Sequence, residues 1–541
     1  MKYDAIIVGG GIAGLTSAAF LAKKGYRTLI CEKQKQVGGL VSSFYYDGFL
    51  FDAGVRGIVD SGIVKPMLKQ LGISVEFVRS IVTIGIEDEF VRVEDLSSLE
   101  HYQTMLEHLY PESKQDIEKI LAEIRKVMDY MDILYGIENP LFKELAKDPQ
   151  YLWKTLLPWL IRFGSKVGKI NRFHVPVYEF LSQLTKNTSL NDIICQHFFQ
   201  QTPASFALSY FSLYLDYEYP VKGTSELIYQ MRDFIVEKGG EIVTDTEIKQ
   251  VNPTQRTIVD QQHNTYEYGQ LIWAADTNQL YRNLNLQEIQ EPQTQNSIVN
   301  QRSFLLGKKG GDSIYSFFLA VDLDKDFFSQ KVSGHSFYTP KKTGQSGAFN
   351  RLAEVKHSQD KNLIFAWMKE YLQYTTYEIA IPSLRNEALA PKGKTGLVIS
   401  VLMDYDFIAN IKALGFYEEF KEFSEQTILE VLSESLFKGL NQKVLHRFSS
   451  TPLTIERMSG NHEGGITGWA YTNQPIPAVH SMMQIKYACQ TPIPNILQAG
   501  QWTFSPSGLP ISILTGKLAA DEATKRDRKS TRLNSSHVSE S

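Results

Sequence analysis

Residues 4–32, DAIIVGGGIAGLTSAAFLAKKGYRTLICE, decide the fold of this chain. Ala5–Val8 is a continuous apolar run of the kind that forms a buried parallel strand. Leu15–Lys24 has helical composition and is closed by Gly25, and Arg27–Cys31 has the composition of a second strand. These segments predict a complete βαβ unit that opens a doubly wound α/β domain.

The turn between the first strand and the helix carries the pattern Gly9-x-Gly11-x-x-Gly14. Gly9 permits the tight turn, Gly11 lets backbone approach a pyrophosphate, and Gly14 lets the helix pack on the strand. The N-terminus of the helix would then face the phosphate charge. Glu32 ends the second strand, where a carboxylate can accept hydrogen bonds from ribose hydroxyls. The pattern predicts a dinucleotide site, and a purely structural glycine turn is the less favoured alternative.

The choice between NAD and FAD depends on the segment that follows, because an acid that contacts ribose suits both. Gly38 and Gly39 come soon after Glu32, and Phe51–Gly54 adds a second cluster of small residues, beside which a flavin ribityl chain would pass. The chain holds one dinucleotide fingerprint and no CxxC pair. A pyridine-nucleotide disulfide reductase would need two fingerprints and a CxxC, so that class is excluded.

Length and composition limit the class of protein. A chain of 541 residues is long enough for a composite enzyme or for two to three intertwined domains. A net charge of -4 without a long basic tract argues against a nucleic-acid partner. The cysteines Cys31, Cys195 and Cys489 lie far apart, so we expect no disulfide framework and no metal site, and a reducing, cytoplasmic location. The uncharged stretch Ala5–Ala22 suits a strand, turn and helix better than a membrane span.

The predicted organisation alternates nucleotide-binding and substrate-binding segments. β-like runs at Ile314–Val321 and Gly396–Leu402 predict a mixed or antiparallel sheet. The polar, Ser-rich tail is expected to be disordered and non-native. The expected divisions are a FAD-binding domain in three parts (1–85, 201–285 and 451–525), a helical cap (86–200), a substrate domain (286–450) and the tail (526–541).

Both ends of the chain resemble a known superfamily. The run from Gly9 to Phe44, followed by Phe51-Asp52-x-Gly54, resembles the FAD-binding end of the amine oxidase and phytoene desaturase superfamily. Residues 499–521, AGQWTFSPSGLPISILTGKLAAD, resemble the closing FAD motif of its carotenoid desaturase, carotene isomerase and retinol saturase branch. Amine oxidases typically carry a Gly-Glu pair where this chain has Gly500-Gln501, which favours the carotenoid branch.

This resemblance implies a glutathione-reductase-type FAD domain, a mixed-sheet substrate domain and a helical cap. Weaker likenesses lie between the ends: Tyr219–Gly223 resembles the family's Tyr-Pro-x-Gly-Gly segment, residues 241–251 the strand pair beside adenine, and Ala274–Asp276 the strand that returns to the cofactor. The residues expected to bind the cofactor are Gly9, Gly11, Ala13, Gly14, Glu32, Lys33, Gly38, Gly39, Leu40, Gly54, Ile248, Ala275, Gly500, Gly508, Leu509 and Pro510.

The implied reaction is hydride exchange between flavin N5 and a carbon beside a conjugated chain, as in a carotenoid or retinoid desaturase, saturase or isomerase. A flavin oxidase of amines or porphyrinogens, and a FAD-free lipid carrier resembling the GDP-dissociation inhibitors, are the alternatives. The direction of hydride transfer, the electron acceptor and the oligomeric state are left open by the sequence.

Three further groups of residues carry weaker indications. Thr202-Pro203 predicts a helix start, after which Phe206, Tyr210, Tyr214 and Tyr217 form either a core stripe or a wall of a polyene slot. His462 and Glu463 are weak catalytic candidates beside a glycine loop, although an ordinary solvent-facing pair is the more expected reading, and His335 is similar.

The segment between Tyr151 and Tyr178 combines aromatic and basic residues and contains no acidic residue. It suits either a surface segment that dips into anionic lipid or a cap helix with a basic edge. The first reading would place the protein at the inner face of a membrane. The basic residues concerned are Lys154, Arg162, Lys166, Lys169 and Arg172.

Overall fold

The computed structural model describes residues 2–143, 145–170 and 173–539, and its core is two large β-sheets. The first sheet has the strand order β10-β2-β1-β13-β12-β11, and β19 pairs with β13. Its central strands run parallel, as the βαβ pattern predicts, while β11 and β12 form an antiparallel edge. The strands are β1 (Lys2–Val8), β2 (Thr28–Cys31), β10 (Glu241–Val243), β11 (Ile248–Asn252), β12 (Thr257–Asp260), β13 (Thr265–Trp273) and β19 (Ile496–Gln498).

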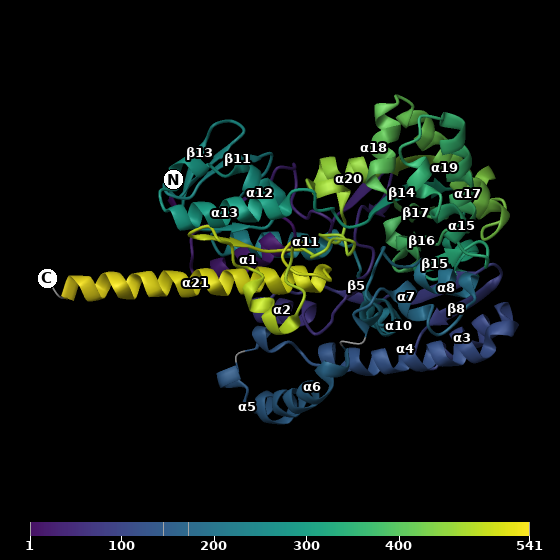
Figure 1. Cartoon of the computed structure of the whole chain (residues 1–541), viewed down its shortest axis with the longest axis horizontal. Coiled ribbons are helices and arrows are strands. Elements are labelled where there is room, and N and C mark those ends of the chain that lie inside the picture. The colour runs from purple at the N-terminus through teal and green to yellow at the C-terminus, as the bar shows by residue number, and fades with distance from the viewer. Residues whose placement is uncertain (1, 144, 171–172, 540–541) are drawn as a thin grey trace.

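Helices cover both faces of the first sheet (Figure 1). One face packs on α1 (Ile12–Lys23), α2 (Val64–Leu71), α11 (Ser225–Glu237) and α21 (Leu509–Ser539). The other face packs on α12 (Thr277–Asn283) and α13 (Pro292–Leu305). This is the doubly wound arrangement, assembled from segments far apart in the chain.

The second sheet is mixed and has the order β18-β14-β17-β16-β15-β7-β8. Only β15 and β7 pair in parallel among its described strands. One face is covered by α17 (Lys361–Tyr374), α18 (Tyr405–Ala413) and α19 (Tyr417–Glu434). The strands are β7 (Val82–Ile86), β8 (Glu89–Val93), β14 (Ser313–Val321), β15 (His335–Thr339), β16 (Tyr377–Ala380), β17 (Thr395–Met403) and β18 (Val444–Ser450).

A helical cap lies below the second sheet in Figure 1 and shares a hydrophobic core with β7, β8 and β15. Two small sheets, the hairpin β3 (Ser43–Tyr46) and β4 (Phe49–Asp52) and the sheet of β5 (Ile58–Val59), β9 (Tyr217–Pro220) and β6 (Phe77–Arg79), complete the fold. The principal cap helices are α3 (Ser98–Leu109), α4 (Lys114–Tyr135), α6 (Leu157–Ile170), α7 (Val177–Leu181), α8 (Thr188–Cys195), α9 (Ala204–Ala207) and α10 (Tyr210–Leu215).

Three of the predicted domain boundaries differ from the structure. The boundary at 200 comes too early, because α9 and α10 pack into the core of the cap. The boundary at 85 cuts through β7, and both β7 and β8 belong to the second sheet, because the chain crosses to that sheet before it enters the cap. The boundary at 286 comes too early, because Ile298 and Leu305 of α13 pack into the core of the first sheet.

The C-terminal tail also differs from the sequence expectation. The segment from residue 526 onward, expected to be disordered, instead continues α21 to Ser539, and Figure 1 shows α21 projecting beyond the body of the protein. No glycine or proline follows Gly516, so nothing in the sequence interrupts the helix. Among the described residues, the last hydrogen bond from α21 to the body joins Asp527 to the Tyr26 hydroxyl at 3.0 Å.

Candidate active site

A cavity of about 850 Å³ lies between the first sheet and the face of the second sheet opposite α17, α18 and α19. Loops that follow β1, β2, β13 and β19 contribute Gly9, Glu32, Ala275 and Gly500 to its lining. All four loops leave the carboxyl ends of parallel strands, which is where ligands bind in open α/β sheets.

The glycine loop has the geometry that close approach to a phosphate requires. Gly9 has φ +103°, and a Cβ added there would lie 2.7 Å from the Ala274 carbonyl oxygen. A Cβ on Gly14 would lie 2.0 Å from the Gly9 carbonyl oxygen, so this position holds α1 against the loop. A Cβ on Gly11 would meet no protein atom within 4 Å. Gly11 therefore presents bare backbone to the cavity at the N-terminus of α1, as pyrophosphate binding requires.

Glu32 is buried at the end of β2 and lines the cavity. Its carboxylate accepts hydrogen bonds from the backbone N–H of Gly10 at 2.7 Å and of Gln34 at 2.8 Å. Burial raises the pKa of Glu32, and these two donors oppose that shift. Each carboxylate oxygen keeps one further acceptor site, so the side chain can still receive ribose hydroxyls.

The closing loop is held against α1 by close packing. A Cβ on Gly516 would lie 2.4 Å from the Ala13 carbonyl oxygen, and the Ser17 hydroxyl lies 2.9 Å from the Gly516 carbonyl oxygen. The Gly500 N–H donates to the Thr515 hydroxyl at 3.0 Å. The start of α21 is thereby fixed beside the glycine loop, and it lines the cavity with Gly508, Leu509 and Pro510.

The structure brings fourteen of the sixteen predicted cofactor residues to this one cavity. The two that do not line it are Gly14, which packs against Gly9, and Gly54. A Cβ on Gly54 would lie 2.2 Å from the Leu40 carbonyl oxygen, so this glycine allows two loops to cross, and its neighbours Ala53 and Val55 face the cavity.

Aromatic side chains line the other part of the cavity. Phe206, Tyr210 and Tyr217 contribute to the wall, whereas Tyr214 lies behind it, packed 5.4 Å from the Phe337 ring. Phe206, Tyr210 and Tyr217 therefore belong to the wall of a slot, whereas Tyr214 belongs to the core. Thr202 is not the helix cap that the sequence predicts: Pro203 occupies the cap position of the short helix α9, and the Thr202 hydroxyl donates back to the Phe199 carbonyl at 2.6 Å.

A buried polar group borders the aromatic wall. Arg56 Nη1 lies 2.9 Å from Glu378 Oε2, and His335 Nε2 lies 3.0 Å from Glu378 Oε1. Burial by itself would raise the pKa of Glu378, but Arg56 and His335 more than offset this and lower it to about 2. Burial lowers the pKa of His335, so the imidazole is neutral near pH 7. The cavity thus contains an ionised carboxylate paired with the Arg56 guanidinium, and Arg385 also helps to lower its pKa.

No sequence motif marks Arg56 or Glu378 as a site residue, and His335 carries only a weak indication. Arg56 comes two residues after Gly54, in the segment that carries the family resemblance, and this proximity was the one signal available. The three residues meet only because β15 and β16 pair and the loop after β4 folds over them.

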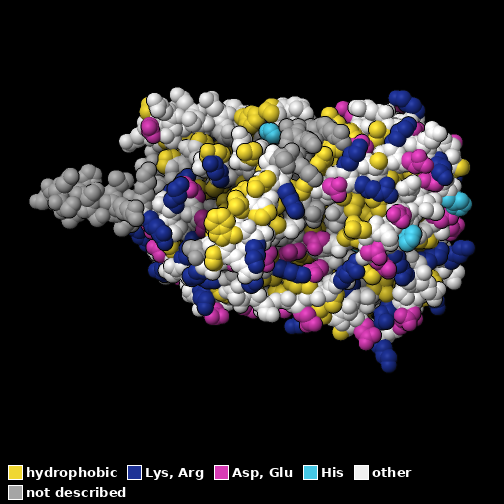
Figure 2. Space-filling view, turned by 90° about the horizontal axis from the view of Figure 1, so that it is seen from below, with side chains coloured by type: hydrophobic (Ala, Val, Ile, Leu, Met, Phe, Trp, Pro, Cys, Tyr) yellow, Lys and Arg dark blue, Asp and Glu magenta, His cyan; other side chains and the backbone are white. Residues whose placement is uncertain are grey.

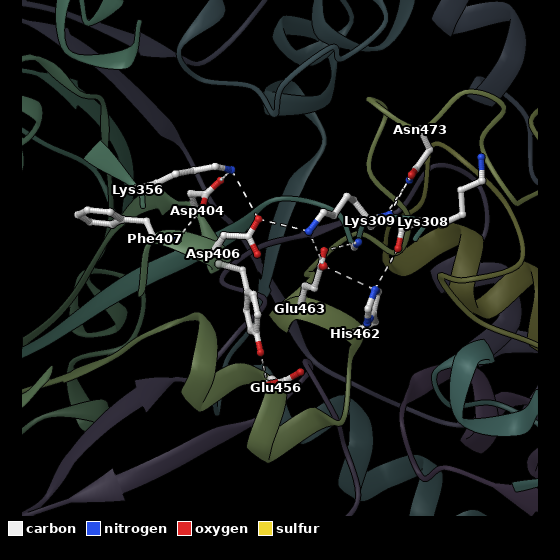
Figure 3. Close-up of polar contacts among 12 residues, drawn as sticks. Lys308, Lys309, Lys356, Asp404, Asp406, Phe407, Glu456, His462, Glu463 and Asn473 are labelled. Carbon is white, nitrogen blue, oxygen red and sulfur yellow. Dashed lines mark hydrogen bonds and ion pairs between the residues drawn. The ribbon is translucent and has the colours of Figure 1, made fainter. Parts of the chain in front are cut away.

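The weak catalytic candidates His462 and Glu463 do not line the large cavity; they border a separate one of about 220 Å³. Figure 3 shows their contacts: Glu463 Oε1 lies 3.0 Å from Lys309 Nζ, and His462 Nε2 lies 3.0 Å from the Lys308 carbonyl oxygen. The backbone N–H of His462 also donates to Asp276 Oδ2 at 2.8 Å. These bonds fix a loop, with Glu463 at φ 53°, and account for both side chains without catalysis.

The glycine loop, the buried acid and the closing loop define a dinucleotide-binding oxidoreductase fold, and comparisons with known proteins agree. Residues 7–71 match the family model for an NAD(P)-binding Rossmann-like domain. A solved structure of putrescine oxidase is similar over 97% of this chain and 99% of its own, with a TM-score of 0.60 and 13% identity, which shows a shared fold.

Full-length relatives narrow the family. The chain is 22% identical over 533 residues to an all-trans-retinol 13,14-reductase of Danio rerio, covering 92% of this chain and 82% of that one. It is 24% identical to a chloroplastic prolycopene isomerase of Daucus carota (86% and 71% covered) and 22% identical to a 1-hydroxycarotenoid 3,4-desaturase of Flavobacterium (96% and 98%). These matches support a phytoene desaturase and retinol saturase-like family, as the terminal motifs predicted.

Proposed function

We propose that this protein binds FAD and exchanges hydride with a carbon–carbon bond of an apolar polyene, a carotenoid or a retinoid. The observation that carries the proposal is one cavity that joins the glycine loop at Gly11 to the aromatic wall at Tyr210 and Tyr217. Bound FAD would supply the hydride chemistry. The chain would hold that cofactor, orient the polyene and exclude water.

The residues fit a dinucleotide. Gly11 and the N-terminus of α1 would take the pyrophosphate, and Glu32 the adenosine ribose. Gly508 and Pro510, at the start of α21, would border the redox-active ring, as the family resemblance implies. The aromatic rings provide the flat apolar contacts that suit a conjugated chain.

Two alternatives fit less well. An amine oxidase would need a site for a cation, but Arg56 neutralises Glu378 in this cavity. A FAD-free lipid carrier would not need the open backbone at Gly11 together with the buried acid Glu32.

The test is an anaerobic visible spectrum of the purified protein lacking residues 529–541, before and after addition of liposomes loaded with phytoene-type polyenes. Loss of the oxidised-flavin absorption on addition of polyene indicates a desaturase. A flavin that stays oxidised points to a saturase, an isomerase or an amine substrate. Failure to take up added FAD contradicts the proposal and favours the carrier.

We further propose that α6 and the turn before it dock on anionic lipid. Trp153, Leu160 and Ile161 are 66%, 50% and 69% exposed. Figure 2 shows hydrophobic side chains gathered on the face of the molecule that carries this segment, with basic side chains among them. Pro158 lies in the first turn of α6 and so does not break it. Lys154 and Arg162 are also exposed, whereas Lys166, Lys169 and Arg172 lie outside the described side chains.

This surface connects with the cavity. The Trp159 indole donates to the Ile133 carbonyl of α4, and Met131, two residues earlier on α4, lines the cavity. An apolar substrate would therefore have a short route from the membrane. No described helix has the length and apolar character to cross a bilayer.

Flotation with anionic liposomes tests the docking surface. Ile161→Ser should reduce the lipid-bound fraction, because it removes an exposed apolar side chain from the membrane face. Val236→Ser is the matched control, since Val236 on α11 is also an exposed apolar side chain, at 56%, but lies outside this segment. Equal flotation of both variants and the parent, or no flotation of the parent, would contradict the proposal.

A further inference from the structure

The face of the second sheet opposite α17, α18 and α19 carries a row of polar residues that a hydrocarbon substrate would not require. Directly opposite one another in register are Glu378 on β16, Ser400 on β17, Ser316 on β14 and Ser450 on β18. The row crosses four strands beneath the cavity, and Glu378 and Ser450 both line it.

Arg56 lies along this row and fixes it. Its Nη1 contacts Glu378 at 2.9 Å, and its Nη2 contacts the hydroxyls of Ser400 at 2.5 Å and Ser316 at 3.1 Å. The guanidinium is thereby held in place from three strands. It orients the carboxylate through a single charged hydrogen bond to Glu378 Oε2, while His335 holds Oε1.

Arg56, His335 and Glu378 all line the cavity, and Glu378 is the most exposed of the three. Its side chain is 31% exposed, whereas Arg56 is 1% and His335 3% exposed. Each carboxylate oxygen has one partner in this group, Arg56 or His335. An ionised carboxylate offers about four lone-pair positions, so acceptor capacity remains on the side that faces the cavity.

The charge of the group selects the kind of ligand. Arg56 balances Glu378, and Arg385 adds a further positive charge nearby. His335 is neutral near pH 7, so an ammonium would find no net negative charge. A pure hydrocarbon end would displace water from the carboxylate and leave its lone pairs without a donor, which is unfavourable in an apolar cavity. A hydroxyl group carries no charge, which suits a group without net negative charge, and it donates one hydrogen bond, which the carboxylate needs.

We propose that Glu378, positioned by Arg56 and His335, binds the hydroxyl group of an alcohol-bearing polyene and so makes the protein selective for alcohols over hydrocarbons and ethers. This inference rests on the proposed function, and it names the substrate class of the same site. Glu378 is a binding residue in this account, and Arg56 and His335 are positioning residues.

The first test uses the unaltered FAD-loaded protein under anaerobic conditions with two probes, all-trans-retinol and its methyl ether, whose binding is followed by quenching of tryptophan fluorescence. The alcohol should bind on the order of 10- to 100-fold more tightly, the range for a hydrogen bond to a charged acceptor. Equal binding would overturn this inference and leave the proposed polyene function standing. Binding of neither probe would refute both. Tighter binding of retinylamine than of retinol would overturn the alcohol assignment in favour of a cation site.

The second test removes the charged pair as a unit. Arg56→Met with Glu378→Gln avoids a buried unpaired charge, which a single change would leave. The preference for alcohol over ether should fall to near one, while flavin absorption and ether binding stay unchanged. The matched control is Arg351→Met with Glu370→Gln, which removes an exposed ion pair beside the second sheet. This variant should keep the full preference for alcohol over ether. A preference that survives in the Arg56 and Glu378 variant would overturn the assignment. If that variant fails to fold, the comparison of the two probes on the unaltered protein decides.

Discussion

Replacing Gly11 by alanine should weaken cofactor binding without harming the apoprotein. Gly11 has φ −73° and ψ 177°, which an alanine adopts without strain, and its added Cβ would meet no protein atom within 4 Å. Gly→Ala at such a position stabilises a fold by about 0.4–1 kcal/mol, because it restricts the unfolded chain. The same methyl group would stand where the pyrophosphate must approach, and crowding of this kind costs about 1–3 kcal/mol. The dissociation constant of FAD should therefore rise about 5- to 150-fold.

The assay is a titration of deflavinated protein with FAD, followed by flavin fluorescence, alongside urea unfolding of the apoprotein. Gly14→Ala is the contrasting variant, because its Cβ would lie 2.0 Å from the Gly9 carbonyl oxygen and should destabilise the apoprotein itself. Unchanged FAD affinity in Gly11→Ala, or an apoprotein as unstable as that of Gly14→Ala, would refute the reasoning.

Three other predictions follow from the site and its surroundings. Burial raises the pKa of Asp312 to about 6 from 3.8, so the folded protein disfavours its ionised form. Asp312→Asn should therefore raise the free energy of unfolding, measured in urea, by about 1–2 kcal/mol at pH 8 and leave it unchanged below pH 3.8. A gain that does not depend on pH would contradict this. Tyr210→Ala should raise the Michaelis constant for a polyene about 10-fold with flavin content unchanged, because Tyr210 lines only the aromatic part of the cavity, and an unaltered constant would assign it to the core. Deleting residues 529–541 should leave FAD affinity and thermal midpoint unchanged, since the described bond of Tyr26 is to Asp527, and a fall in either would show that the tail is structural.

Local patterns predicted the shape of the glycine loop, because its geometry is encoded in short segments, and the nucleotide that it would hold stays a prediction. The turn requires Gly9, the expected approach of a pyrophosphate requires Gly11, and the packing of α1 on the loop requires Gly14, all within a few residues. Glu32 follows from the strand that precedes it. The closing motif around Gly508 was identified by its resemblance to a family, and the structure places it in the same cavity.

The substrate end was not predictable in the same way. Arg56, His335 and Glu378 come from three elements, and only the register of β15 against β16 and of β16 against β17 places them together. Cross-strand register over long sequence separations is not written in any short motif. His462 and Glu463 attracted attention because they stand beside glycines, yet Glu463 serves a loop contact with Lys309 and the Gly310 N–H.

The packing of α21 on α1 joins residues nearly 500 positions apart, as the 2.9 Å contact between Ser17 and the Gly516 carbonyl shows. During synthesis the glycine loop leaves the ribosome first, and the helix that completes the cavity leaves last. A nascent chain would carry half of a nucleotide site until its final segment is available. Cofactor capture would then report that the whole chain has been made, and prematurely terminated chains would remain without FAD, with the apolar side of α1 exposed to chaperones and proteases.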